Sequence, residues 1–139
     1  MRLSGFGSLL LVALLASAVA GCSNSNTVTG PTEPVLTTDT FTGTLSPGGT
    51  NYHTLIARTG DVVLTVTSIA PDPTVKIGVG FGVYSVLTCT PVMTNGSATV
   101  GTQLLGVTTA TTSLCIAVYD PGTIPTGGTL TYQLTVSHY

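Results

Sequence analysis

Residues 75–84, which read VKIGVGFGVY, have the clearest alternation of residue types in the chain. The apolar residues of this stretch alternate with other residue types, and a period of two is typical of a β-strand with one face in a core. Three of the residues on the opposite face are glycines, which have no side chain to cover the sheet. We therefore expect a bulge or bend at this strand, or the close approach of another backbone segment.

Similar short runs occur on both sides of this stretch. Those before it are residues 40–45, 52–57 and 61–69, and those after it are 86–89, 103–107, 114–120 and 130–137. Turn signals rich in Gly, Pro, Asn and Asp separate many of them, and we assign residues 94–97 (TNGS) to such a turn. No segment after Gly21 has a helical period. Seven to eight such strands predict an all-β protein with an antiparallel β-sandwich, and a barrel is the alternative.

Composition agrees with a β-rich domain and excludes two classes of protein. Threonine accounts for 28 of the 139 residues, and β-branched residues favour strands. The chain has 3 Lys and Arg residues and a formal net charge of -2, which excludes a nucleic-acid-binding footprint. A hydrophobic content of 42% with so little net charge is the reverse of the pattern of disordered chains.

The N-terminal segment has the pattern of an export signal. After Arg2, residues 9–19 (LLLVALLASAV) form an apolar stretch that is too short to span a bilayer but has the length of a signal-peptide core. It ends in residues 19–22 (VAGC), which resemble the bacterial lipobox, so we predict a lipoprotein signal peptide over residues 1–21 and lipidation of Cys22. The alternative is ordinary cleavage after Ala20. The predicted location is outside the cytoplasm, anchored to the bacterial membrane, with the outer membrane or cell surface preferred.

The cysteine count supports this interpretation. The chain has 3 Cys, and an unpaired thiol in an exported protein needs an explanation, which acylation of Cys22 provides. Cys89 and Cys115 then remain as a pair, and we predict a disulfide between them, with two separate buried thiols as the alternative. No cysteine or histidine spacing indicates a zinc site.

The chain divides into three parts. After the signal peptide, residues 22–34 contain the acylated Cys22 and a polar, Pro-containing and Asn-containing stretch that is typical of a flexible tether. Residues 35–139 form the β-sandwich domain.

Several strand motifs of this domain resemble a known family. They are residues 41–45 (FTGTL), 46–49 (SPGG), 52–55 (YHTL), 60–66 (GDVVLTV) and 130–136 (LTYQLTV). In this order they resemble the bacterial pre-peptidase C-terminal domain, which implies a jelly-roll-like sandwich. Members of that family that bind calcium use several carboxylates, whereas the carboxylates here are widely spread. Asp61, Asp72 and Asp120 are the candidate ligand or calcium residues, and a role as turn residues that bond their own backbone is the alternative.

Few residues offer catalytic chemistry. The only histidines are His53 and His138, both in strand patterns, and we predict that His53 is a packing residue with a hydrogen-bond partner. The chain has no G-x-S-x-G motif. We therefore predict no catalytic residues, no cofactor, no resident metal and no enzymatic activity.

The predicted function is that of a lipid-anchored, non-catalytic module of the cell envelope or surface that mediates interaction or assembly. The alternative is a ligand-binding module for glycan or calcium. The expected partners are the membrane, through the lipid on Cys22, and a protein or glycan that the sequence does not identify.

Overall fold

The computed structural model describes residues 33–139 of the chain, and this part contains eight β-strands. The strands are β1 (Thr37–Leu45), β2 (Thr50–Ala57), β3 (Gly60–Ala70), β4 (Ile77–Ser85), β5 (Thr88–Ala98), β6 (Gln103–Thr108), β7 (Thr112–Tyr119) and β8 (Leu130–His138). No helix occurs in these residues, and so none there could cross a membrane.

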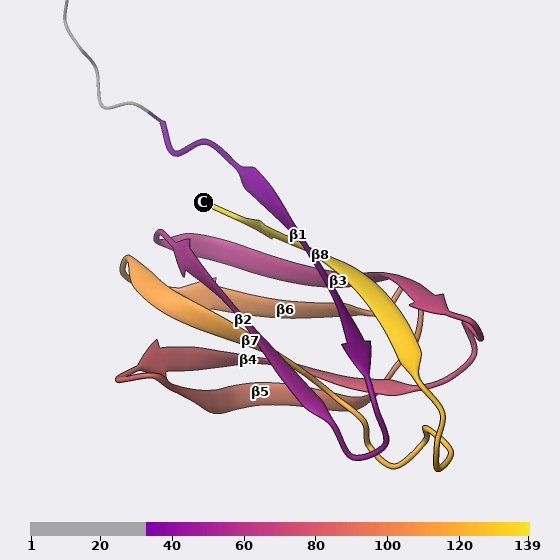
Figure 1. Cartoon of the computed structure of the whole chain (residues 1–139). Helices are drawn as coiled ribbons and strands as arrows, with labels where there is room; N and C mark the ends of the chain where they lie inside the picture. The colour runs from indigo at the N-terminus through magenta and orange to yellow at the C-terminus, as the bar shows by residue number, and fades with distance from the viewer. Residues whose placement is uncertain (1–32) are drawn as a thin grey trace, which may run out of the picture. The chain divides into compact units, whose positions relative to one another are not determined.

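The strands form two four-stranded sheets with the orders β1-β8-β3-β6 and β2-β7-β4-β5 (Figure 1). Every pair of neighbouring strands is antiparallel. Most connections cross from one sheet to the other, and this strand order is that of a jelly roll. The predicted antiparallel, jelly-roll-like β-sandwich is confirmed, and it has eight strands. Because the strands form two separate sheets, the alternative of a barrel is wrong.

The core lies between the two sheets and is built from alternate residues of the long strands. From one sheet, β3 contributes Val62, Leu64 and Val66, all at most 1% exposed. From the other sheet, β4 contributes Ile77 and Val79, which are fully buried. Because successive residues of a strand point to opposite faces, this burial explains the period of two in the sequence.

The glycine face of β4 is covered by the neighbouring strand β5 at Gly80 and Gly82, and by the Tyr119 ring of β7 at Gly78. A Cβ atom on Gly80 would lie 2.7 Å from the carbonyl oxygen of Met93, and one on Gly82 would clash with the carbonyl oxygen of Thr90. The pairing of β4 with β5 also shifts register at two places, which are β-bulges that bend β5. Both parts of the expectation for the glycine face are therefore confirmed.

Two local predictions in this hairpin were wrong. Residues 94–97 lie inside β5, where the side chain of Asn95 accepts a hydrogen bond from the Ser97 N–H at 2.9 Å within one of the bulges. Residues 86–89 do not form a strand of their own. Val86 and Leu87 are instead the two-residue turn between β4 and β5, with φ angles of 47° and 63°.

Because the strands alternate in direction, the loops gather at two ends of the sandwich. We call the end where β1 starts the proximal end and the opposite end the distal end. The proximal end contains the start of β1, the end of β8 and the connections β2–β3, β4–β5 and β6–β7 (Figure 1). The distal end contains the connections β1–β2, β3–β4, β5–β6 and β7–β8. The chain therefore enters and leaves the sandwich at the proximal end.

Candidate functional site: an apolar groove between the sheets

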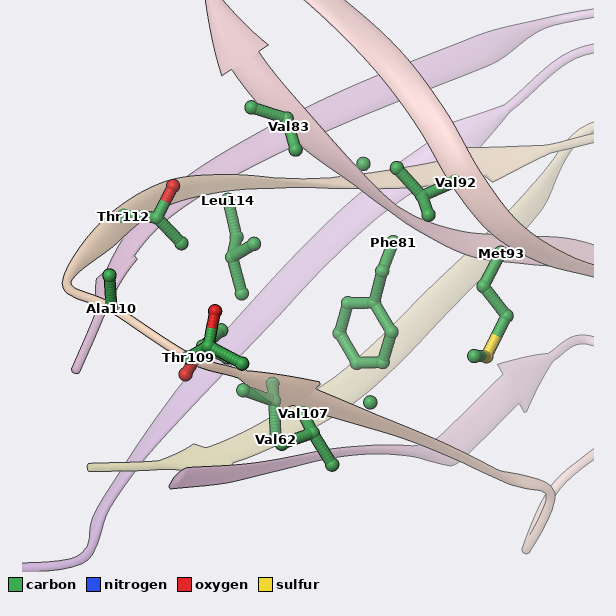
Figure 2. Close-up of a pocket in the computed structure, with 13 residues that line it drawn as sticks. Val62, Phe81, Val83, Val92, Met93, Val107, Thr109, Ala110, Thr112 and Leu114 are labelled. Carbon is green, nitrogen blue, oxygen red and sulfur yellow. The ribbon is translucent and has the colours of Figure 1, made fainter. Parts of the chain in front are cut away.

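An open groove of about 360 Å³ lies between the two sheets, on the side where β5 and β6 are the edge strands. Figure 2 shows Phe81 near its centre, with Met93 and Val92 from β5 on one side and Val107 on another. The rest of the lining is aliphatic residues, glycines and threonines, and none of its side chains is ionisable. The groove can bind an apolar group, but its lining offers no acid or base for catalysis.

Gly106 explains why the groove is open above Phe81. The inward-facing positions of β6 are Leu104, Gly106 and Thr108, and the middle one carries no side chain. A Cβ atom on Gly106 would lie 3.5 Å from the Phe81 ring, which is ordinary van der Waals contact. A larger residue at this position would therefore occupy space that is now part of the groove.

The rim of the groove exposes large apolar side chains. Val92 is 74% exposed and Val107 is 73% exposed, and Val83 and Met93 are partly exposed beside them. Single exposed apolar residues are ordinary on a protein surface, but a contiguous set around a groove indicates an interaction site.

The two edge strands beside the groove differ in how well they are protected against pairing with another chain. β5 contains Pro91 and two bulges, features that disfavour strand addition. β6 (QLLGVT) contains no proline and no charged residue, and its pairing with β3 has no register shift. Within residues 33–139, the outer edge of β6 pairs with no other strand and is open to a partner strand.

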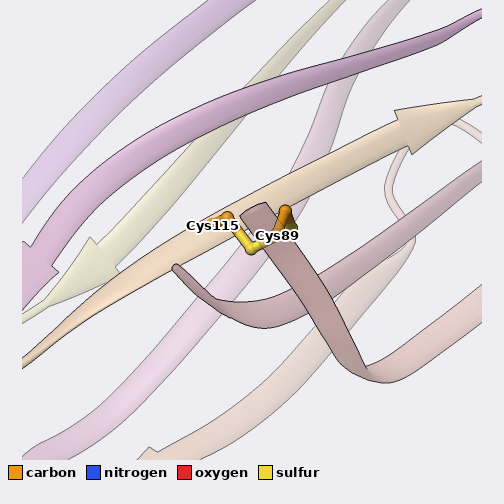
Figure 3. Close-up of a disulfide and its surroundings, with 2 residues drawn as sticks. All are labelled: Cys89 and Cys115. Atoms are coloured by element: carbon orange, nitrogen blue, oxygen red, sulfur yellow. A yellow bond between two sulfur atoms is a disulfide. The ribbon is translucent and has the colours of Figure 1, made fainter. Parts of the chain in front are cut away.

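The disulfide between Cys89 and Cys115 holds β5 in place over β4 (Figure 3). These cysteines lie on β5 and β7, which are separated in the sheet by β4, yet their Cα atoms are only 5.8 Å apart. The bridge passes over Gly82, where a Cβ atom would lie 2.8 Å from Cys115 Sγ. The predicted disulfide is confirmed, and the alternative of two separate thiols is wrong.

Asp120 organises the β7–β8 loop at the distal end. Its Oδ2 accepts a hydrogen bond from the Gly48 N–H at 2.9 Å, and its Oδ1 accepts from the N–H groups of Gly122, Thr123 and Ile124 at 2.8–3.1 Å. Burial by itself would raise the pKa of the Asp120 carboxyl, but these backbone hydrogen bonds lower the pKa to about 2. The carboxylate is thus engaged with its own loop and with the β1–β2 turn.

The other two candidate ligand residues lie elsewhere. Asp72 is in the β3–β4 loop. Its Oδ1 accepts hydrogen bonds from Thr74 Oγ1 at 2.7 Å and from the Thr74 N–H at 2.9 Å. The hydrogen bond from the Thr74 hydroxyl, together with the one from the Thr74 backbone, lowers the pKa of Asp72. Asp61 is on β3 at the proximal end, opposite Val107. Within residues 33–139 no three His, Cys, Asp or Glu side chains lie close enough to hold a metal ion.

His53 occupies the opposite margin of the core from the groove. Its Nε2 lies 2.8 Å from the hydroxyl of Tyr132, and its ring packs on Phe41 with the centroids 4.9 Å apart. Burial lowers the pKa of His53, so the neutral ring is favoured. The prediction that His53 is a packing residue with a hydrogen-bond partner is confirmed.

Sequence reasoning missed one polar pair. His138 Nε2 lies 3.0 Å from Asp39 Oδ2, which joins the last strand to the first. His138 is 6% exposed, so this contact satisfies a buried polar group. The two residues are 99 positions apart, and only the pairing of β1 with β8 brings them together.

Cys22, the predicted lipidation site, lies outside the described residues.

No protein-family model and no curated protein matches the chain. Among solved structures, the chain is similar to PliG of Aeromonas hydrophila, a periplasmic inhibitor of g-type lysozyme, at 19% identity and a TM-score of 0.49, over 72% of this chain and 84% of that chain. The fold is defined by the strand order β1-β8-β3-β6 and β2-β7-β4-β5.

Proposed function

We propose that this protein is a lipid-anchored, non-catalytic module of the bacterial cell envelope or surface that binds an extended segment of a partner protein. The observation that carries the proposal is the apolar groove beside the open edge of β6. No ionisable side chain lines this groove, so its chemistry suits recognition and not acid–base catalysis.

The geometry favours an extended segment as the occupant. A strand added to the edge of β6 would gain main-chain hydrogen bonds. Its alternate side chains would point inward toward Phe81 and Met93, because successive residues of a strand face opposite sides. Apolar residues at every second position of the partner would therefore bind best.

Selection of peptides tests this binding mode. Random peptides about ten residues long, displayed on phage and selected on the immobilised full chain, should converge on alternating apolar residues. Gly106→Leu fills the groove and should weaken the selected peptides at least about tenfold. Val100→Thr, which lies in the distal β5–β6 loop, is the matched control and should leave binding unchanged. Peptides without alternation, or peptides that bind Gly106→Leu as well as wild type, would contradict the proposed binding mode.

Lipid anchoring through Cys22 is a separate part of the proposal. With Cys89 and Cys115 joined to each other, Cys22 is the one cysteine that the disulfide leaves for acylation. Acylation with more than one chain would provide stable membrane attachment.

Metabolic labelling checks the anchor. Bacteria that express the full chain and receive an alkyne analogue of palmitate should label the wild type, and Cys22→Ser should lose the label. Labelling that persists in Cys22→Ser would rule out this acylation site.

The alternative function is a ligand-binding module for glycan or calcium, with Asp61, Asp72 and Asp120 as candidate ligands. Two of these carboxylates accept hydrogen bonds from their own loops, which accounts for their positions without a ligand. Calcium titration by calorimetry and a glycan array would favour this alternative if either gave saturable binding. We also propose that the domain is related to the bacterial pre-peptidase C-terminal domain, and the jelly-roll strand order supports this relationship.

A further inference from the structure

The β4–β5 turn exposes two large aliphatic side chains at its tip. Val86 is 92% exposed and Leu87 is 89% exposed. Both have positive φ angles, 47° and 63°, as in a type I′ turn. Asn and Gly favour these angles, whereas a β-branched residue such as Val disfavours them. The turn thus keeps two large apolar side chains at positions where Asn or Gly would fit the backbone conformation better.

Other exposed aliphatic residues lie at the same end of the sandwich. Val35 and Leu36 precede β1, and Ile56 is near the end of β2, with exposed fractions of 57–73%. In contrast, the distal loops of the described domain expose one large hydrophobic residue, Val100. The proximal end is therefore the apolar end of the domain.

The covalent connection to the proposed anchor enters at this end. Thr37, the first residue of β1, follows Cys22 by 15 residues, which span at most about 50 Å when fully extended. The distal loops lie a further strand length away, about 30 Å for a strand of nine residues. The length of chain that separates a membrane-held Cys22 from the proximal end is thus shorter than its separation from the distal loops.

Charge at the proximal end is compatible with a lipid headgroup layer. The exposed charged side chains at this end are Glu33 before β1, Arg58 in the β2–β3 connection and Asp61 on β3. The carboxylate of Asp39 pairs with His138. A weakly charged end with protruding aliphatic residues suits the interface of a bilayer better than a strongly charged partner.

We infer that the proximal end faces the membrane and that the Val86–Leu87 turn inserts into the bilayer interface. This inference rests on the proposed lipid anchor at Cys22 and gives the anchored domain an orientation. The groove and the β6 edge then remain open on the side of the sandwich for a partner protein.

Tryptophan fluorescence tests the insertion, because the chain has no tryptophan of its own. The full chain carrying Leu87→Trp is bound to vesicles of phosphatidylethanolamine and phosphatidylglycerol with brominated acyl chains. The new indole should shift its emission to the blue and be quenched at least about twofold relative to unbrominated vesicles. Val100→Trp is the matched control at the distal end and should be neither shifted nor quenched.

A second variant removes the apolar side chains of the turn without disturbing its fold. Val86→Asn with Leu87→Gly gives the turn its preferred residues, so thermal stability should be kept or increased. In the compact unit of residues 33–139, where neither the apolar signal segment nor a lipid contributes, this double substitution should reduce vesicle binding at least about threefold. Unchanged vesicle binding would overturn the inference.

The outcomes distinguish this inference from the anchor proposal. If intact mass shows an acylated protein but the indole of Leu87→Trp is not quenched, the insertion is wrong and the anchor stands. If no lipid is found on Cys22 but quenching occurs on vesicles, the anchor is wrong and the insertion stands. A blue shift that depends on protein concentration and shows no quenching would assign the turn to self-association and overturn the inference.

Discussion

At the scale of single residues, Gly82 determines whether the disulfide can form. No larger residue fits there, because a Cβ atom would lie 2.8 Å from Cys115 Sγ and would also clash with the Thr90 carbonyl oxygen. Gly82→Ala should therefore lower the free energy of unfolding by about 3 kcal/mol, measured by denaturant titration.

Gly106→Ala is the matched control for this substitution. It places the same methyl group 3.5 Å from the Phe81 ring, in ordinary contact, and should change stability by less than about 1 kcal/mol. Equal effects of the two substitutions would show that β5 does not press against the glycine face of β4.

Asp120 gives a second prediction at this scale. Removal of the carboxylate in Asp120→Ala leaves four backbone N–H groups without their acceptor and should cost about 2 kcal/mol at pH 7. The exposed Asp72→Ala is the control and should cost less. If both variants melt at the same temperature, the Asp120 network does not stabilise the loop.

The pH dependence of stability follows from the lowered pKa of Asp120. The folded-state pKa is about 2 and the ordinary value is 3.8, so the unfolded state takes up the proton first as pH falls. The contribution of Asp120 is complete above about pH 4 and should be lost as the pH falls toward 2. Thermal melts of wild type and Asp120→Asn should therefore converge over this range, and a constant difference would contradict the assignment.

At the scale of elements, β5 depends on the disulfide more than any other strand does. It is an edge strand with two bulges, and residues 88–97 are exposed or half-buried. Replacement of both cysteines by alanine should lower stability by about 2–4 kcal/mol. Hydrogen exchange should accelerate more in β5 than in β1 and β8, because β5 also opens locally when the bridge is absent. Uniform acceleration throughout the sandwich would contradict a local role for the bridge.

The sequence predicted the strands whose large core side chains occupy every second position, and it failed where the apolar residues do not alternate. β3, β4, β7 and β8 pack alternate residues into the core, and their period of two is visible in the sequence. β5 has no such alternation, and its Asn95-Gly96 dipeptide is a local turn signal. In the structure, contacts with β4 override this local preference and place the dipeptide in a bulge.

At the scale of the whole molecule, the candidate groove could not be predicted from the sequence. It requires Phe81 from β4, Met93 from β5 and Gly106 from β6, and their alignment depends on bulges that no local pattern specifies. The pairing of Asp39 with His138 is similar, since it depends on the first and last strands being neighbours. The disulfide was predictable because the number of cysteines limits the possible pairs.

The pairing of β1 with β8 has a mechanical consequence if the proposed lipid anchor holds the domain by its N-terminal end. Thr37 lies opposite His138, and the hydrogen bonds between the two strands run perpendicular to the strand axes. A pulling force that enters at Thr37 and is resisted at the distal loops loads this ladder in shear, so many bonds must break together. A force resisted at the end of β8 would instead peel the same bonds apart one at a time. The domain should therefore resist traction directed along its length and yield when its two terminal strands are drawn apart.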